Sequence, residues 1–142
     1  MKGKVLPLEE VQDQVFSQRL MGDGFAIELD DDYVYAPFDG EVVMTYPTGH
    51  AYGLKSEDGI EVLIHIGMDT VALNGNGFKP QVKVGDKIKQ GDKLVFVDCE
   101  YIRSQNKSLV SPIIFTSGEH ITLKQIKEVK TLKEDIIELK EE

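Results

Sequence analysis

The chain has 142 residues, a formal net charge of −9 at pH 7 and one cysteine, Cys99, so no internal disulfide can form. This length suits a single domain over residues 1–142 with a substantial core, and the excess of carboxylates argues against nucleic acid or an anionic membrane as the main partner while favouring basic proteins. Because no apolar leader or spanning segment is visible, we expect a cytoplasmic protein without direct membrane insertion.

Short strands separated by glycine-rich turns dominate the prediction. Strands are expected over residues 1–6 (an edge strand), 25–29, 33–36, 41–46, 78–84, 93–97 and 109–115. Pro112, inside the last of these, indicates an edge strand or a bulge. One helix is expected over residues 98–105.

A short repeat lies between two of these strands. Gly85-Asp86-Lys87-Ile88 is followed closely by Gly91-Asp92-Lys93-Leu94. The repeat predicts two tight bends on a small barrel or sandwich rather than a solenoid.

Residues 50–66 are predicted to form a β-hairpin that carries two histidines. A strand at 50–55 is followed by Ser-Glu-Asp-Gly at 56–59, residue types that favour chain reversal, and by a β-branched run. Pairing Lys55 with Ile60 across this turn places His50 directly opposite His65. Opposed residues have Cβ atoms about 4.5 to 5.5 Å apart, so both rings could touch one bound group.

The register of this hairpin decides whether the rings meet. Only a slip by an odd number of residues would send one ring through the sheet. Such a slip is disfavoured by one apolar row on the second strand, which should face a core: Ile60, Val62, Ile64 and Ile66. His65 is expected on the other face, beside Leu63 and, across the ladder, Tyr52.

Facing imidazoles can bind a metal, shuttle a proton, or accept and stabilise a phosphoryl group. Zinc requires three or four protein ligands, and no His-x-His motif or cysteine pair accompanies the two histidines. We therefore expect no resident metal or other cofactor, although adventitious zinc could bind at His50 and His65. Thr48 could fix the tautomer of His50, whereas Asp69 by composition reads as a loop carboxylate and His120 as a surface residue.

Six segments together carry a resemblance to a known family. They are GDGFAI at 22–27, YAPFDG at 35–40, TGHA at 48–51, HIGMDTV at 65–71, LNGNGF at 73–78 and VGD at 84–86. In order and spacing they closely resemble the glucose-type enzyme IIA (EIIA) domain of the bacterial phosphoenolpyruvate:sugar phosphotransferase system. Chains of that family usually begin further upstream of Gly3, so the first strand is expected to be trimmed or to belong to a larger natural polypeptide.

The resemblance implies an all-β fold, an antiparallel β-sandwich or barrel-sandwich hybrid with one or two short helical turns. It also implies a phosphocarrier that takes a phosphoryl group from phosphohistidine on HPr and passes it to an EIIB domain for sugar uptake. For the tail, apolar spacing over residues 122–139 fits one face of a helix. The family topology implies instead a turn and a last strand near 136–140, which we adopt.

The resemblance also implies roles for individual residues. His65 would accept the phosphoryl group through Nε2, with its Nδ1 proton held by the carbonyl of Gly67. His50 would contact the phosphoryl oxygens, and Thr48 would orient His50. The implied docking surface for HPr and EIIB is apolar with acidic residues, as suits a basic partner: Asp13, Val15, Phe16, Leu20, Met21, Tyr46, Leu63, Asp69, Val71 and Glu119.

Two other classes compete with this interpretation. A lipoyl- or biotinyl-type carrier module also uses Gly-Asp bends such as those at Gly85 and Gly91, but it should present a lysine at a hairpin tip, which is not visible here. A zinc hydrolase on a related barrel would need ligand motifs that the sequence lacks.

Overall fold

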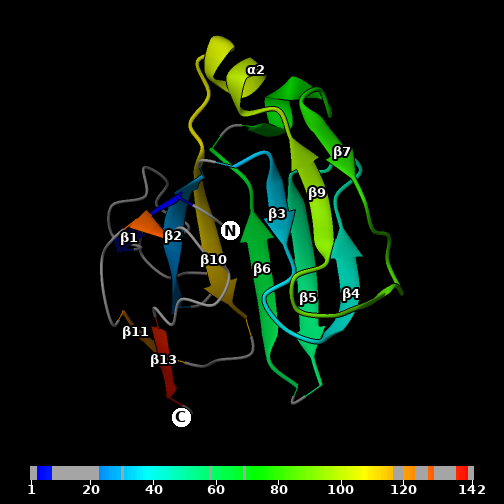
Figure 1. Cartoon of the computed structure of the whole chain (residues 1–142), viewed down its shortest axis with the longest axis vertical. Helices are drawn as coiled ribbons and strands as arrows, with labels where there is room; N and C mark the ends of the chain where they lie inside the picture. Colours follow the sequence, from blue (N-terminus) through cyan, green and yellow to red (C-terminus); the bar gives the residue numbers. More distant parts are fainter. Residues whose placement is uncertain are drawn as a thin grey trace.

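The computed structural model describes residues 3–7, 23–29, 31–57, 59–68, 70–116, 120–123, 128–129 and 137–140. Side chains are described within residues 24–116, apart from 30, 58, 69 and 71. This part of the chain is built from antiparallel strands with two short helical segments, α2 (Cys99–Ser104) and η2 (Thr70–Leu73) (Figure 1). The all-β prediction is therefore confirmed.

Three sheets are formed by the described residues. The largest has eight strands in the order β12-β1-β2-β10-β6-β5-β4-β8. Their bounds are β1 (Gly3–Pro7), β2 (Asp23–Leu29), β4 (Gly40–Thr45), β5 (Ala51–Ser56), β6 (Glu61–His65), β8 (Lys87–Ile88), β10 (Val110–Phe115) and β12 (Glu128–Val129). The others are β3-β9-β7, from β3 (Tyr33–Tyr35), β9 (Lys93–Val97) and β7 (Phe78–Pro80), and β11-β13, from β11 (His120–Leu123) and β13 (Ile137–Lys140).

The main core lies between the three-stranded sheet and the larger one. In Figure 1 the β3-β9-β7 sheet lies across the β6-β5-β4 part of the large sheet. One hydrophobic cluster joins Val34, Val95 and Val97 of the small sheet to Leu54 and Ile64 of the large sheet. Strand alternation sends these side chains to one face, so burial of this face holds the two layers together.

Both predictions of an edge strand are wrong, because β1 and β10 each pair with a strand on either side. The edge position expected for the first strand is wrong, because β1 pairs with β2 on one side and with β12 on the other, where Gly3 pairs with Val129. Pro112 pairs with Ala26 of β2, while the ladder between β10 and β6 begins only at Ile113. Pro112 therefore lies on a part of β10 whose ladder is one-sided, where a residue without an N–H is tolerated.

The end of the chain forms a strand, as predicted. β13 pairs with β11, with His120 opposite Lys140 and Leu123 opposite Ile137. The helix-like apolar spacing of this region is thus not realised in its described residues. Propensity and periodicity are weak signals when strand pairing competes.

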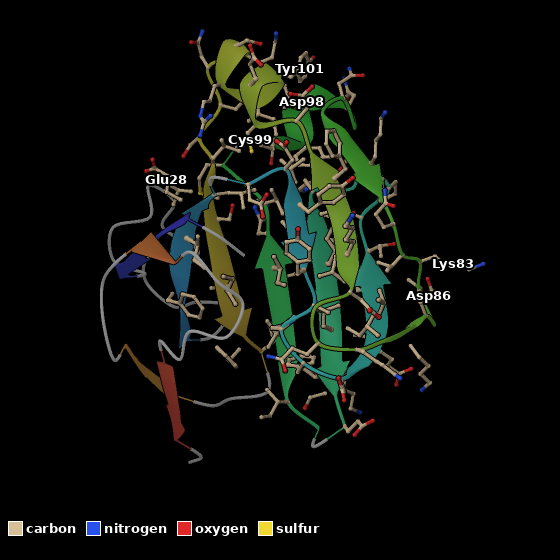
Figure 2. All side chains as sticks on the ribbon, viewed as in Figure 1. Glu28, Lys83, Asp86, Asp98, Cys99 and Tyr101 are labelled. Atoms are coloured by element: carbon tan, nitrogen blue, oxygen red, sulfur yellow. The ribbon has the colours of Figure 1, made fainter. Side chains whose placement is uncertain are left out.

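The two predicted bends are copies of one turn. Asp86 Oδ2 accepts a hydrogen bond from the backbone N–H of Lys83 at 2.9 Å, and Asp92 Oδ2 accepts one from Lys89 at 2.9 Å. Lys83 and Asp86 mark the first bend at the margin of the molecule (Figure 2). Both glycines have positive φ, near +94° and +93° at Gly85 and Gly91, a backbone conformation that glycine adopts at little cost.

The predicted helix at 98–105 is confirmed as α2. Asp98 caps it by accepting a hydrogen bond from the N–H of Tyr101 at 3.0 Å, and the side chains of its own residues Cys99 and Ile102 are buried. Asp98, Cys99 and Tyr101 lie together at this end of the molecule (Figure 2). No helix among the described residues is long and apolar enough to span a membrane.

Candidate functional site

The histidine hairpin is present, but its register is one residue away from the prediction. Lys55 pairs with Glu61 rather than Ile60, and Ala51 rather than His50 pairs with His65. Tyr52 consequently pairs with Ile64 and lies in the main core, so the prediction that it shares a face with His65 is wrong.

The two imidazole rings nevertheless meet. Their centroids are 5.0 Å apart with an interplanar angle of 75°. His50 lies one residue before β5 and after Gly49, whose φ is +75°, so strand alternation does not set the direction of its ring. Its carbonyl accepts a hydrogen bond from the N–H of Ile66 at 2.7 Å, which ties the His50 backbone to the end of β6. The expectation that an odd slip separates the rings is therefore wrong.

The tautomer of His65 follows from its hydrogen bond. Its Nδ1 lies 2.8 Å from the carbonyl oxygen of Gly67. A carbonyl can only accept, so Nδ1 carries the proton and Nε2 carries the lone pair in the neutral ring. His65 is partly exposed, in contrast to the 2% exposed His50. The site thus presents a nucleophilic nitrogen beside a buried second ring.

Only glycine fits at position 67 without strain. Its φ is +73°, and a Cβ there would lie 2.5 Å from the carbonyl oxygen of Ser108 and 2.6 Å from Cγ2 of Thr70. Both distances are shorter than van der Waals contact. Because glycine has no Cβ, residue 67 can adopt the backbone conformation in which its carbonyl oxygen lies close to Nδ1 of His65.

Burial makes His50 a neutral ring. Thr48 Oγ1 is hydrogen-bonded to its Nδ1, and the ring of Tyr46 packs edge-to-face at a centroid distance of 5.1 Å. Burial, and secondarily the charge of His65, lowers the pKa of His50 from 6.5 to about 4. Near neutral pH His50 therefore contributes hydrogen bonding rather than a full positive charge.

The structure describes the side chains of only two of the predicted docking residues, Tyr46 and Leu63. Tyr46 is 40% exposed beside His50, whereas Leu63 is 6% exposed and packs with Ala51 and Met68. Val71 lies in η2, but its side chain is outside the described residues. The remaining members also lie outside them: Asp13, Val15, Phe16, Leu20, Met21, Asp69 and Glu119. The docking surface stays a prediction.

Two hydroxyl residues at the site were not singled out in the sequence. Thr70 and Ser111 are fully buried and hydrogen-bond the carbonyl and the N–H of the Ile66–Gly67 peptide unit. A signal existed for Ser111, because it is a polar residue within a strand whose following residues are apolar. Within the part of the chain that the structure describes, no group of three or more His, Cys, Asp or Glu residues is arranged to hold a metal ion.

Comparison with known proteins identifies the family. Residues 1–121 match the family model described as phosphoenolpyruvate-dependent sugar phosphotransferase system, EIIA 1. The chain belongs to this family. It is also similar to a solved structure, glucose permease IIA from Mycoplasma capricolum, with 41% sequence identity and a TM-score of 0.84. That match covers 96% of this chain and 88% of the other.

The EIIA chain is therefore a phosphocarrier, a phosphotransferase component of a sugar transport system. The family implies two kinds of partner, an HPr phosphocarrier and an EIIB domain. The lipoyl-type carrier and the zinc hydrolase are not favoured.

Proposed function

We propose that His65 is the residue that carries the phosphoryl group, on Nε2, between phospho-HPr and EIIB. The observation that carries this proposal is the bond from His65 Nδ1 to the Gly67 carbonyl, 2.8 Å long, which leaves the lone pair on Nε2. In the transfer, a bond forms between Nε2 and phosphorus while the N–P bond of the donor phosphohistidine breaks. Since Nε2 already has its lone pair, the step needs positioning and charge stabilisation rather than a general base.

His50 is proposed to stabilise the transferred group. If the hydroxyl of Thr48 donates to Nδ1 of His50, the ring proton lies on Nε2 and can be donated to a phosphoryl oxygen. A bound phosphoryl dianion would also favour the charged imidazole and so raise the pKa of His50 from its value of about 4. His50 would then add stabilisation where negative charge accumulates.

The docking surface proposed for both partners surrounds this pair of rings. It consists of Tyr46, Leu63 and the residues Asp13, Val15, Phe16, Leu20, Met21, Asp69, Val71 and Glu119. Its support is the exposure of Tyr46 next to His50 and the charge of −9, which would attract a basic partner and give a salt-dependent association rate. A cytoplasmic location belongs to the same proposal, because a chain with one cysteine needs no oxidising compartment.

Labelling with enzyme I, HPr and ³²P-phosphoenolpyruvate tests the assignment. His65→Ala should take up no label. His50→Ala should take up label but pass it slowly to an added EIIB domain. The third histidine supplies a matched control, so His120→Ala should accept and transfer like the parent. Label on His65→Ala at the parental level would refute the proposal.

A further inference from the structure

Three polar or charged residues are buried among the side chains that the structure describes, namely His50, Thr70 and Ser111. All three lie close to His65, because the ring of His50 is 5.0 Å from that of His65, and Thr70 and Ser111 hydrogen-bond the backbone next to the carbonyl that binds His65. A fully buried hydroxyl is costly unless it is hydrogen-bonded. The function of the Thr70 and Ser111 hydroxyls must therefore be sought in the hydrogen bonds that they make.

The two hydroxyls hold the two ends of one peptide unit. Thr70 Oγ1 donates to the carbonyl oxygen of Ile66 at 2.6 Å, and the N–H of Gly67 donates to Ser111 Oγ at 3.0 Å. Ser111 in turn donates its hydroxyl proton to the carbonyl of Leu109 at 2.9 Å, which fixes its oxygen as the acceptor. The plane of the Ile66–Gly67 peptide is thus held from both sides.

The following peptide unit is held in the same way. Its carbonyl, that of Gly67, accepts from His65 Nδ1, and its N–H, that of Met68, donates to the carbonyl of Ser108 at 3.1 Å. Glycine has the widest choice of backbone conformations, so Gly67 is the point at which these planes could most easily rotate. Rotation of the first plane would change φ of Gly67 and turn its carbonyl away from His65.

We infer that Ser111 and Thr70 are positioning residues for His65: their hydroxyls fix the backbone of Gly67 so that its carbonyl holds the proton on Nδ1. Ser111 lies on β10 and Thr70 begins η2, so two separate elements meet at this glycine. The tautomer of a histidine is set by the partner of its other nitrogen. The consequence for phosphoryl transfer rests on the proposed function of His65.

The first test is the tautomer itself, read from ¹⁵N chemical shifts of the His65 ring in the full chain at neutral pH. The parent should show a proton on Nδ1. Thr70→Val and Ser111→Ala should each show a measurable population with the proton on Nε2. Thr70→Ser and Ser111→Thr keep the hydroxyl and should restore the parental pattern. Thr116→Val and Ser104→Ala remove exposed hydroxyls elsewhere and serve as matched controls.

The second test is the rate at which phospho-HPr labels each variant. Misplacement by about 1 Å can cost a hundredfold in rate, and we expect a loss of at least about tenfold in Thr70→Val and Ser111→Ala. The conservative variants and both controls should label within about twofold of the parent. A parental tautomer pattern in both hydroxyl-deleted variants would overturn the inference, as would the same tautomer change in the controls.

The parent chain supplies a measurement that needs no variant to fold. The amide proton of Gly67 should exchange with solvent as slowly as that of Ile64 in the centre of the sheet, since Ser111 holds it. Fast exchange at Gly67 would overturn the inference. Failure of the proposed function looks different, because His65→Ala would then retain label while the tautomer results remained as expected.

Discussion

Acidification should destabilise this protein through His50. The pKa of His50 is lowered from 6.5 to about 4 in the folded chain, so between these values the unfolded chain binds the extra proton. The contribution of neutral His50 to the free energy of unfolding is therefore fully present above about pH 6.5 and is lost as the pH falls toward 4. With these two values, linkage gives a loss of about 2 kcal/mol between about pH 7 and pH 5 from His50 alone.

Urea unfolding of the parent and of His50→Gln at both pH values measures this contribution. Other titrating groups act on both chains, so the difference between parent and variant isolates His50. That difference should shift by about 2 kcal/mol, roughly 1 M in urea midpoint for a domain of this size. Parallel behaviour of the two chains would refute the reasoning. In His65→Gln the pKa of His50 should stay below 6.5, because burial is the larger cause.

Gly67→Ala should lose at least about 1 to 2 kcal/mol of unfolding free energy from the left-handed backbone alone and label slowly, and parental values in both assays would contradict this. Tyr52→Phe should gain about 1 kcal/mol in urea unfolding, because the buried Tyr52 hydroxyl has no hydrogen-bond partner among the described residues; a loss would contradict it. Asp86→Ala and Asp92→Ala should each cost about 1 kcal/mol in the same assay, and clearly unequal costs would show that the bends are not equivalent.

The parts of the fold that were predictable are those set by a few neighbouring residues. The Gly-Asp bends and the helix capped by Asp98 depend on local hydrogen bonds that their own sequence supplies. The last strand, β13, was predicted from the family resemblance against its apolar spacing. The position of the first strand was not predictable, because its outer partner, β12, follows more than a hundred residues later.

The predicted register of the hairpin is wrong because of a hydrogen bond in the turn. The prediction closed the loop by pairing Lys55 with Ile60, whereas Ser56 donates its N–H to the Ile60 carbonyl at 2.8 Å and the ladder starts one residue later, at Glu61. Ser56 Oγ also accepts from the N–H of Ile60 at 3.0 Å. A side-chain bond of this kind can add a residue to a turn, and residue types alone do not reveal it.

The two rings stay together in spite of the register change because His50 lies one residue outside β5, where strand alternation does not set the direction of its ring. Gly49 turns the chain just before His50, and Gly67 turns it two residues after His65, each with positive φ. A Cβ on Gly49 would lie 3.2 Å from Cβ of Phe78, so that turn is packed closely against β7. Each ring thus stands where a strand begins or ends, and its direction is set by hydrogen bonds to Thr48 or Gly67. A slip that would reverse a residue in mid-strand therefore leaves the two rings together.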